Sequence, residues 1–337
     1  MSADGRRPAA WRVLAVALLA TLFFLVQVQT GMPAAGEHLD ISWLMVMGWG
    51  WLNGAEIGRE LVFTYGPWAI VHPWMAYQEA LFPGFLAAML LFAVLVTTVM
   101  AQAAWRLPGP GLELLALAVL ALAPVLQGDA AWFLVLGLVP VLLAGRLRLA
   151  DGAGHVAALM PAAALCGWLA VVKFSFLPAA GLLWLTGGGA LALGGRHRDA
   201  AAWALTLPGA VLAFWLLGGQ PLAGLAGYLG NGWDVAVHYG VTMGLGMGWA
   251  ADASGLVLLC GIGLVLCTLL WRQRSDRAGA LLTLACGGLV FLAWRAGYTR
   301  AEGHIAFFAA AGVAASLYLA TVLAPARRLP VASAGLV

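Results

Sequence analysis

The feature that most restricts the fold of this chain is a series of apolar segments, each close to 20 residues long, that follow one another along nearly the whole sequence. A helix needs about 20 mostly apolar residues to cross the roughly 30 Å hydrocarbon layer of a bilayer. Hydrophobic residues make up 63% of the chain and charged residues 9%, whereas soluble domains are about half apolar and about a quarter charged. We therefore predict an all-α, polytopic integral membrane protein with about ten transmembrane helices, at residues 11–30, 82–105, 112–127, 130–145, 156–172, 175–193, 200–218, 255–271, 278–294 and 305–324.

The basic residues indicate how these helices are oriented. Of the 17 Lys and Arg residues, all but Arg59, Lys173, Arg295 and Arg300 fall at segment ends that alternating crossings place on one side. Because basic residues concentrate in cytoplasmic loops, that side is predicted to be the cytoplasm, which also puts both termini there. The positive charges occur in short, separate groups, so they do not indicate a nucleic-acid partner.

The loops predict one transmembrane domain over residues 1–337, without a soluble C-terminal domain. Two long extracytoplasmic loops are expected, at 31–81 and 219–254. Within the first, residues 42–53 are apolar and rich in Trp but too short to cross, which favours a helix lying at the membrane surface. The first apolar segment also has features of a signal peptide. An uncleaved helix fits the charge alternation better, because cleavage would move the new N-terminus outside.

Lys173 is the single residue that departs most clearly from this pattern. It is the only lysine in the chain, and it lies at the outer end of an apolar segment. Ionisable residues at the edge of a membrane span are costly to bury, and they often mark functional sites. Lys173 is therefore a candidate for binding an external phosphate or carboxylate. The alternatives are snorkelling to the interface and pairing with an acidic loop residue.

A second candidate group lies between the last two predicted crossings, in the segment WRAGYTRAEGHIAFF. Its members are Arg295, Arg300, Glu302 and His304. Guanidinium groups bind phosphate oxygens in a bidentate geometry, so two external arginines can hold an anionic substrate. The alternative is an ion-paired loop, for instance through Arg300 and Glu302.

Acidic residues of the first two external loops form a third candidate group. Asp40 follows the first crossing, close to Glu37, and Asp129 lies in the short turn before residues 130–145. A carboxylate here can accept a proton from a hydroxyl group or ligate a divalent cation. Asp is also a favoured helix N-cap, which is the structural alternative for both. Tyr65, in FTYGPW, can donate a hydrogen bond to a substrate or simply stabilise a Gly-Pro turn.

Taken together, these segments resemble the GT-C superfamily of polytopic glycosyltransferases. The likeness lies in the order of helices and loops along the chain. A first helix is followed by a long external loop with Asp40 near its start, and a later, short external loop carries Asp129. The stretch LDISWLMVMGWGWLNGAEIGRELVFTYGPW is similar to the first loop of a set of bacterial GT-C-like membrane proteins with a D-x-S-W and an F-T-Y-G-P motif. The segments VVKFS and RAGYTRAEGHIAFF resemble their later blocks.

This resemblance implies a location in the bacterial inner membrane and transfer of a sugar from a polyprenyl-phosphate-linked donor to an acceptor at the extracytoplasmic face. It implies Asp40 as catalytic base or as ligand of Mg²⁺ or Mn²⁺, and Asp129 as a second acidic group. Lys173, Arg295 and Arg300 would bind the lipid-linked phosphate. Two other functions stay open: a transporter or lipid flippase, and a non-catalytic GT-C-like subunit of a polysaccharide assembly complex.

Overall fold

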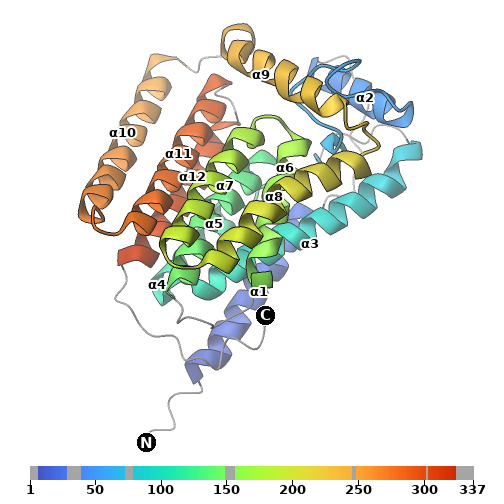
Figure 1. Cartoon of the computed structure of the whole chain (residues 1–337). Helices are drawn as coiled ribbons and strands as arrows, with labels where there is room; N and C mark the ends of the chain where they lie inside the picture. Colours follow the sequence, from blue (N-terminus) through green and yellow to red (C-terminus); the bar gives the residue numbers. More distant parts are fainter. Residues whose placement is uncertain are drawn as a thin grey trace, which may run out of the picture.

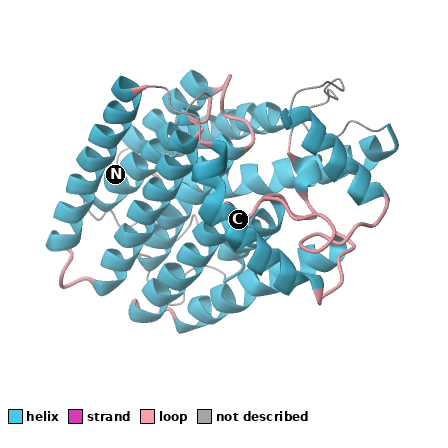
Figure 2. Ribbon diagram, turned by 90° about the horizontal axis from the view of Figure 1, so that it is seen from above, coloured by secondary structure: helices cyan, strands magenta, loops and turns pink. Residues whose placement is uncertain are grey.

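The computed structural model describes residues 7–28, 39–72, 79–148, 156–244, 248–300 and 303–323. Most residues in these ranges are helical, and within them the only β structure consists of isolated β-bridges (Figure 2). The α-helices are α1 (Arg7–Gln27), α2 (Leu39–Leu52), α3 (Phe82–Arg106), α4 (Gly109–Leu122), α5 (Asp129–Leu147), α6 (Met160–Val172), α7 (Phe176–Leu193), α8 (His197–Leu217), α9 (Gly224–Met243), α10 (Trp249–Arg272), α11 (Arg277–Thr299) and α12 (Ile305–Leu323).

The lengths and composition of these helices agree with a polytopic membrane protein. Within the described ranges, eight helices are long and apolar enough to cross a bilayer. Two shorter apolar helices, Gly109–Leu122 and Ala157–Val172, lie at the two remaining predicted crossings. The all-α prediction is confirmed, and the number of ten crossings stays a prediction.

Helix α5 is the centre of the bundle. Nearly all of its residues are buried, and it packs against α3, α7, α11 and α12. Its contact with α12 is close because Gly137 lies there: a Cβ atom at this position would come within 2.4 Å of the Ala314 Cβ. Small residues at helix interfaces permit such approach in membrane proteins, where dispersion contacts replace the hydrophobic effect. By contrast, α1 and α10 lie at the edge of the bundle with few of their side chains buried, as expected for lipid-facing helices (Figure 1).

One end of the bundle, here called the arginine end, is held together by guanidinium groups. Arg12 donates to the carbonyl oxygens of Ala104, Trp105 and Leu107, and so joins the start of α1 to the end of α3. Cations at helix C-termini are favourable because they satisfy free carbonyl groups and face the negative end of the helix dipole.

Two further arginines act at the same end. Arg148 donates to the carbonyl oxygens of Thr321 (2.6 Å) and Val322 (3.1 Å) at the end of α12. Arg146, at the end of α5, forms a buried bidentate ion pair with Asp199 in the first turn of α8, at 2.6 and 2.9 Å. Most basic residues therefore gather at one end, as the charge pattern predicts.

The opposite end, here called the loop end, carries the long connections. Helices α2 and α9 lie across it (Figure 1). Helix α2 covers most of residues 42–53, which confirms a helix there, and its location at the membrane surface stays a prediction. Helix α9 occupies a stretch that was predicted as a loop.

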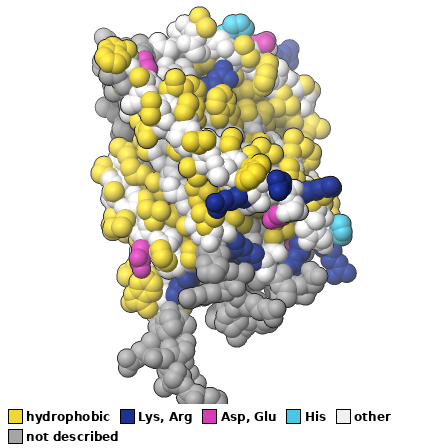
Figure 3. Space-filling model, turned by 90° about the vertical axis from the view of Figure 1, so that its left-hand side faces the viewer, with side chains coloured by type: hydrophobic (Ala, Val, Ile, Leu, Met, Phe, Trp, Pro, Cys, Tyr) yellow, Lys and Arg dark blue, Asp and Glu magenta, His cyan; other side chains and the backbone are white. Residues whose placement is uncertain are grey.

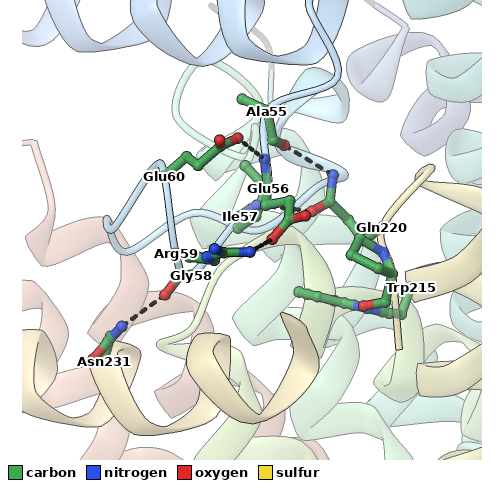
Figure 4. A network of polar contacts seen from close by, with 10 residues as sticks. Ala55, Glu56, Ile57, Gly58, Arg59, Glu60, Trp215, Gln220 and Asn231 are labelled. Carbon is green, nitrogen blue, oxygen red and sulfur yellow. Dashed lines mark hydrogen bonds and ion pairs between the residues drawn. The ribbon is translucent and has the colours of Figure 1, made fainter. Parts of the chain in front are cut away.

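The segment 53–72 after α2 is held by two polar side chains (Figure 4). The Gln220 amide donates to the Ala55 carbonyl (3.2 Å) and accepts from the Ile57 N–H (2.7 Å). Asn231 of α9 donates to the Gly58 carbonyl (2.6 Å). Gly58 has a φ of +87°, and a Cβ atom here would lie 2.3 Å from the Tyr228 nitrogen, so this turn requires glycine.

The same segment then pairs with the end of α6. Thr64 accepts from the Phe174 N–H (2.7 Å), and the Gly66 N–H donates to the Val172 carbonyl (2.9 Å). Tyr65 and Lys173 consequently face each other in an antiparallel bridge. This backbone pairing places the first loop against the α6–α7 turn.

We expect Gly66→Ala to destabilise the protein because its Cβ atom would lie 2.2 Å from the Val171 carbonyl oxygen. Overpacking of this kind costs about 1–3 kcal/mol. Thermal unfolding in detergent micelles measures the effect. Gly181→Ala is the control, because no atom lies within 4 Å of its added Cβ and Ala is the better helix former. Equal unfolding temperatures for the two variants would contradict the backbone pairing.

Candidate functional site

Asp129 occupies the first position of the central helix α5. The preceding Gly128 has a φ of +53°, so the chain turns sharply into the helix at a conformation that favours glycine. Asp129 is 5% exposed. A carboxylate at a helix N-terminus faces the positive end of the helix dipole, which stabilises its charge.

Lys173 is the partner of this carboxylate. It follows directly after α6, in an extended conformation, and its ammonium group forms an ion pair with the Asp129 Oδ2 atom. The pair joins the start of α5 to the turn between α6 and α7. Pairing with an acidic loop residue was one of the alternatives for Lys173, and Asp129 is that residue.

Two residues of the first loop complete the group. The Lys173 Nζ atom lies 4.9 Å from the centre of the Tyr65 ring, a cation–π distance. The His72 Nε2 atom lies 3.9 Å from the Asp129 Oδ1 atom. His72 follows the 3₁₀-helix Ala69–Val71, which begins just after the Gly-Pro turn. Asp129, Lys173, Tyr65 and His72 are called the aspartate–lysine site below.

Aromatic rings surround the aspartate–lysine site and limit the motion of its side chains. Tyr65 is stacked on Trp43 of α2, with ring centres 4.6 Å apart. His72 contacts Tyr65 and Trp132 edge-on, at 5.4 and 5.8 Å. The site is therefore mostly enclosed by aromatic rings, and electrostatic interactions are stronger in such a low-dielectric environment than in water.

Burial and charge determine the protonation of these groups. Burial lowers the pKa of Lys173, but the nearby Asp129 carboxylate and Tyr65 outweigh it, so the net pKa is raised and the ammonium stays charged. Burial also lowers the pKa of His72 to about 4, against the opposing effect of Asp129. His72 is accordingly a neutral imidazole near pH 7.

Two polar atoms of the site have unused hydrogen-bonding capacity. Among the described residues, neither the Asp129 Oδ1 atom nor the His72 Nδ1 atom has a hydrogen-bond partner, although both are buried. Buried polar atoms normally have partners. Both atoms therefore retain the capacity to form a further hydrogen bond.

The structure brings together three of the predicted site residues: Asp129, Lys173 and Tyr65. His304, just before α12, is a fourth neighbour, since its charge contributes to the lowered pKa of His72. His304 also contacts Phe307, with ring centres 5.0 Å apart.

The remaining predicted residues are Arg295, Arg300, Asp40, Glu37 and Glu302. Arg295 is exposed on α11, and Arg300 is half-buried just after that helix. Asp40 belongs to α2, but its side chain lies outside the described structure, as do Glu37 and Glu302. Within the described ranges no group of three or more His, Cys, Asp or Glu side chains could hold a metal ion. The metal predicted at Asp40 stays a prediction.

His72 is the site residue that sequence reasoning missed. Its signal is weak: it is the one ionisable residue in AIVHP, after the FTYGPW turn. Only the pairing of residues 64–68 with the end of α6 shows that this turn leads the chain back to Asp129.

Comparison of the chain with family models, with curated proteins and with solved structures finds no match.

Removing either member of the Asp129–Lys173 pair should destabilise the protein more than removing both. Asp129→Asn leaves a buried ammonium and Lys173→Met leaves a buried carboxylate, and breaking a buried pair costs about 3–5 kcal/mol. Asp129→Asn/Lys173→Met leaves neither charge, so its loss of stability should be smaller than the loss in either single variant. Thermal unfolding of the four proteins in detergent gives the comparison.

Glu56→Gln is the matched control for this cycle. It removes an ion pair with Arg59 (3.1 Å) whose arginine is 76% exposed, so its effect should stay below about 1 kcal/mol. If the double variant loses as much stability as the two single variants together, the result would contradict a coupled buried pair.

Proposed function

We propose that the protein is a membrane glycosyltransferase that moves a sugar from a polyprenyl-phosphate-linked donor to an acceptor hydroxyl at the extracytoplasmic face of the bacterial inner membrane. The observation that carries the proposal is the aspartate–lysine site. It contains a buried ion pair, a neutral imidazole and two unpartnered polar atoms at the end of the bundle opposite the arginines. The positive-inside rule makes the arginine end cytoplasmic and the loop end extracytoplasmic.

Lys173 is the proposed phosphate anchor. A lipid-linked donor lies in the bilayer with its phosphate at the interface, and the loop end offers Lys173 at that level. The Lys173 side chain is 16% exposed, so in this proposal a phosphate oxygen approaches along its exposed part while Asp129 stays paired with the ammonium. Asp129 keeps Lys173 charged and in place, which makes Asp129 a positioning residue.

The proposed reaction breaks the bond between sugar C1 and the phosphate oxygen and forms a bond between C1 and the acceptor oxygen. The acceptor proton goes to Asp40, a residue of the first turn of α2. The negative charge that develops on the leaving phosphate is stabilised by Lys173, and prearranged electrostatic stabilisation of this kind is often the largest contribution to catalysis. Arg300 and His304 are further candidates for the donor phosphate. A Mg²⁺ or Mn²⁺ ion at Asp40 is the alternative role for this carboxylate.

The position of the charges favours an enzyme over a transporter. A transport path predicts ionisable groups near the middle of the membrane, often on broken helices. The buried charged side chains of the described structure, Asp129, Arg146, Arg196 and Asp199, all lie at or next to helix ends. This distribution supports chemistry at one face.

The test is the transfer of radiolabelled sugar from polyprenyl-phosphate donors in proteoliposomes. Wild type should transfer the label. Asp40→Asn should reduce the rate by about 10²–10⁴, the usual contribution of a general base. Asp129→Asn/Lys173→Met should also lose transfer, and its recovered stability separates this loss from unfolding. Asp234→Asn, an exposed acidic residue of α9 at the same end, is the matched control and should keep the full rate.

Two results would contradict the proposal. One is the absence of transfer by wild type across a broad panel of sugar donors. The other is full transfer by both Asp40→Asn and Asp129→Asn/Lys173→Met. Either would favour a non-catalytic role in a larger membrane assembly.

A further inference from the structure

A cavity of about 250 Å³ lies at the arginine end, far along α5 from the aspartate–lysine site. It is bounded by the ends of α5, α7 and α12 and by the turn that joins α10 to α11. Pockets that bury a drug-sized ligand whole are about 300–1,000 Å³. This cavity is therefore suited to a small group, such as the headgroup of a larger molecule.

The inner walls are apolar and their few polar groups are fixed. Leu147, Leu282 and Val322 form much of the lining. Behind them, the Tyr318 hydroxyl donates to the Gly279 carbonyl (3.3 Å) and lies 3.0 Å from the Thr283 hydroxyl. Because these hydrogen bonds already fix the polar side chains of the cavity, a ligand could bind without a large rearrangement of the protein.

The cavity carries one positive and one negative side chain, and each is anchored to a helix end. Arg148 is held by the Thr321 and Val322 carbonyl groups at the end of α12. The Asp276 Oδ1 atom accepts from the Gly279 N–H at the start of α11, which leaves the Oδ2 atom for another donor. Both residues are exposed, so the cavity reaches the surface. Arg148 is positive and Asp276 is negative, and both line the opening of this small cavity. Such a pair of charges is complementary to a zwitterionic ligand.

The surroundings indicate a membrane lipid. Figure 3 shows the side of the bundle on which α10 lies. On that side, Lys and Arg side chains gather mainly in the lower half, next to hydrophobic surface. The described helix ends that carry most of the arginines would lie at the level of lipid headgroups, and basic pockets between transmembrane helices bind such headgroups. Acyl chains would then run along the exposed apolar side chains of α10, for example Leu264 and Trp271.

We propose that this cavity binds the headgroup of a phospholipid that carries both a phosphate and a primary ammonium group. Arg148 binds the phosphate, and Asp276 accepts hydrogen bonds from the ammonium. A quaternary ammonium has no N–H group to donate to Asp276, and an anionic headgroup meets repulsion there. The site is independent of the proposed glycosyl transfer.

The test is lipid retention measured by native mass spectrometry. The full-length protein is taken from vesicles with equal amounts of phosphatidylethanolamine, phosphatidylcholine and phosphatidylglycerol. Wild type should retain phosphatidylethanolamine about tenfold better than the other two, as expected for one charge-assisted contact. Asp276→Asn should abolish this preference, while Asn still caps α11.

Further variants make the comparison specific. Arg148→Gln should weaken retention of all three lipids, because each carries the phosphate that Arg148 binds. Arg198→Gln, which changes an exposed arginine at the same end, should leave retention unchanged. Asp252→Asn, exposed in the first turn of α10, is the matched acidic control.

Equal retention of the three lipids by wild type would overturn the proposal, and so would an unchanged preference in Asp276→Asn. Soluble phosphoethanolamine provides a last control. If it displaces the lipid at equal concentration, the cavity recognises a soluble ligand instead of a membrane lipid.

Discussion

The ion pair between Asp129 and Lys173 is the contact on which the loop end depends. It connects the first residue of the central helix with the turn between α6 and α7, and Tyr65 and His72 bring the first loop to the same point. Charges in so dry a place are costly unless they are paired, so the two residues constrain each other's position. Breaking the pair would leave one buried charge without its partner at this end of the bundle.

The two ends of the bundle show how a mostly apolar chain uses its few polar residues. At the arginine end, Arg12 and Arg148 satisfy carbonyl groups at the ends of α3 and α12, while Arg146 pairs with Asp199. At the loop end, Gln220 and Asn231 hold the first loop. Polar groups at helix ends satisfy backbone groups that no membrane lipid can satisfy. This division leaves the middle of the bundle to apolar and small residues.

Much of this architecture could be predicted from the sequence, because segment length and charge alternation reflect the bilayer directly. The positions of the long apolar helices, the helical character of α2 and the exceptional place of Lys173 among the basic residues belong to this class. Helix α9 was not predicted, because its glycines, Gly224 to Gly240, lower helix propensity and resemble a loop.

The composition of the site could be predicted only in part. Asp129, Lys173 and Tyr65 were each identified from local features, but their mutual contacts depend on the pairing of residues 64–68 with the end of α6. That pairing joins segments about a hundred residues apart, and no periodicity records it. His72 was missed for the same reason. The catalytic roles of Asp40 and of the external arginines remain proposals.

The most direct test of the central claim, that Lys173 is a phosphate anchor, is an electron cryomicroscopy structure in lipid nanodiscs with bound polyprenyl phosphate. We predict phosphate density within hydrogen-bonding distance of the Lys173 ammonium, about 2.7–3.2 Å, with Asp129 still facing it. Phosphate density elsewhere in the protein, with the Asp129–Lys173 pair unchanged and inaccessible, would contradict the account and assign the pair to stability alone.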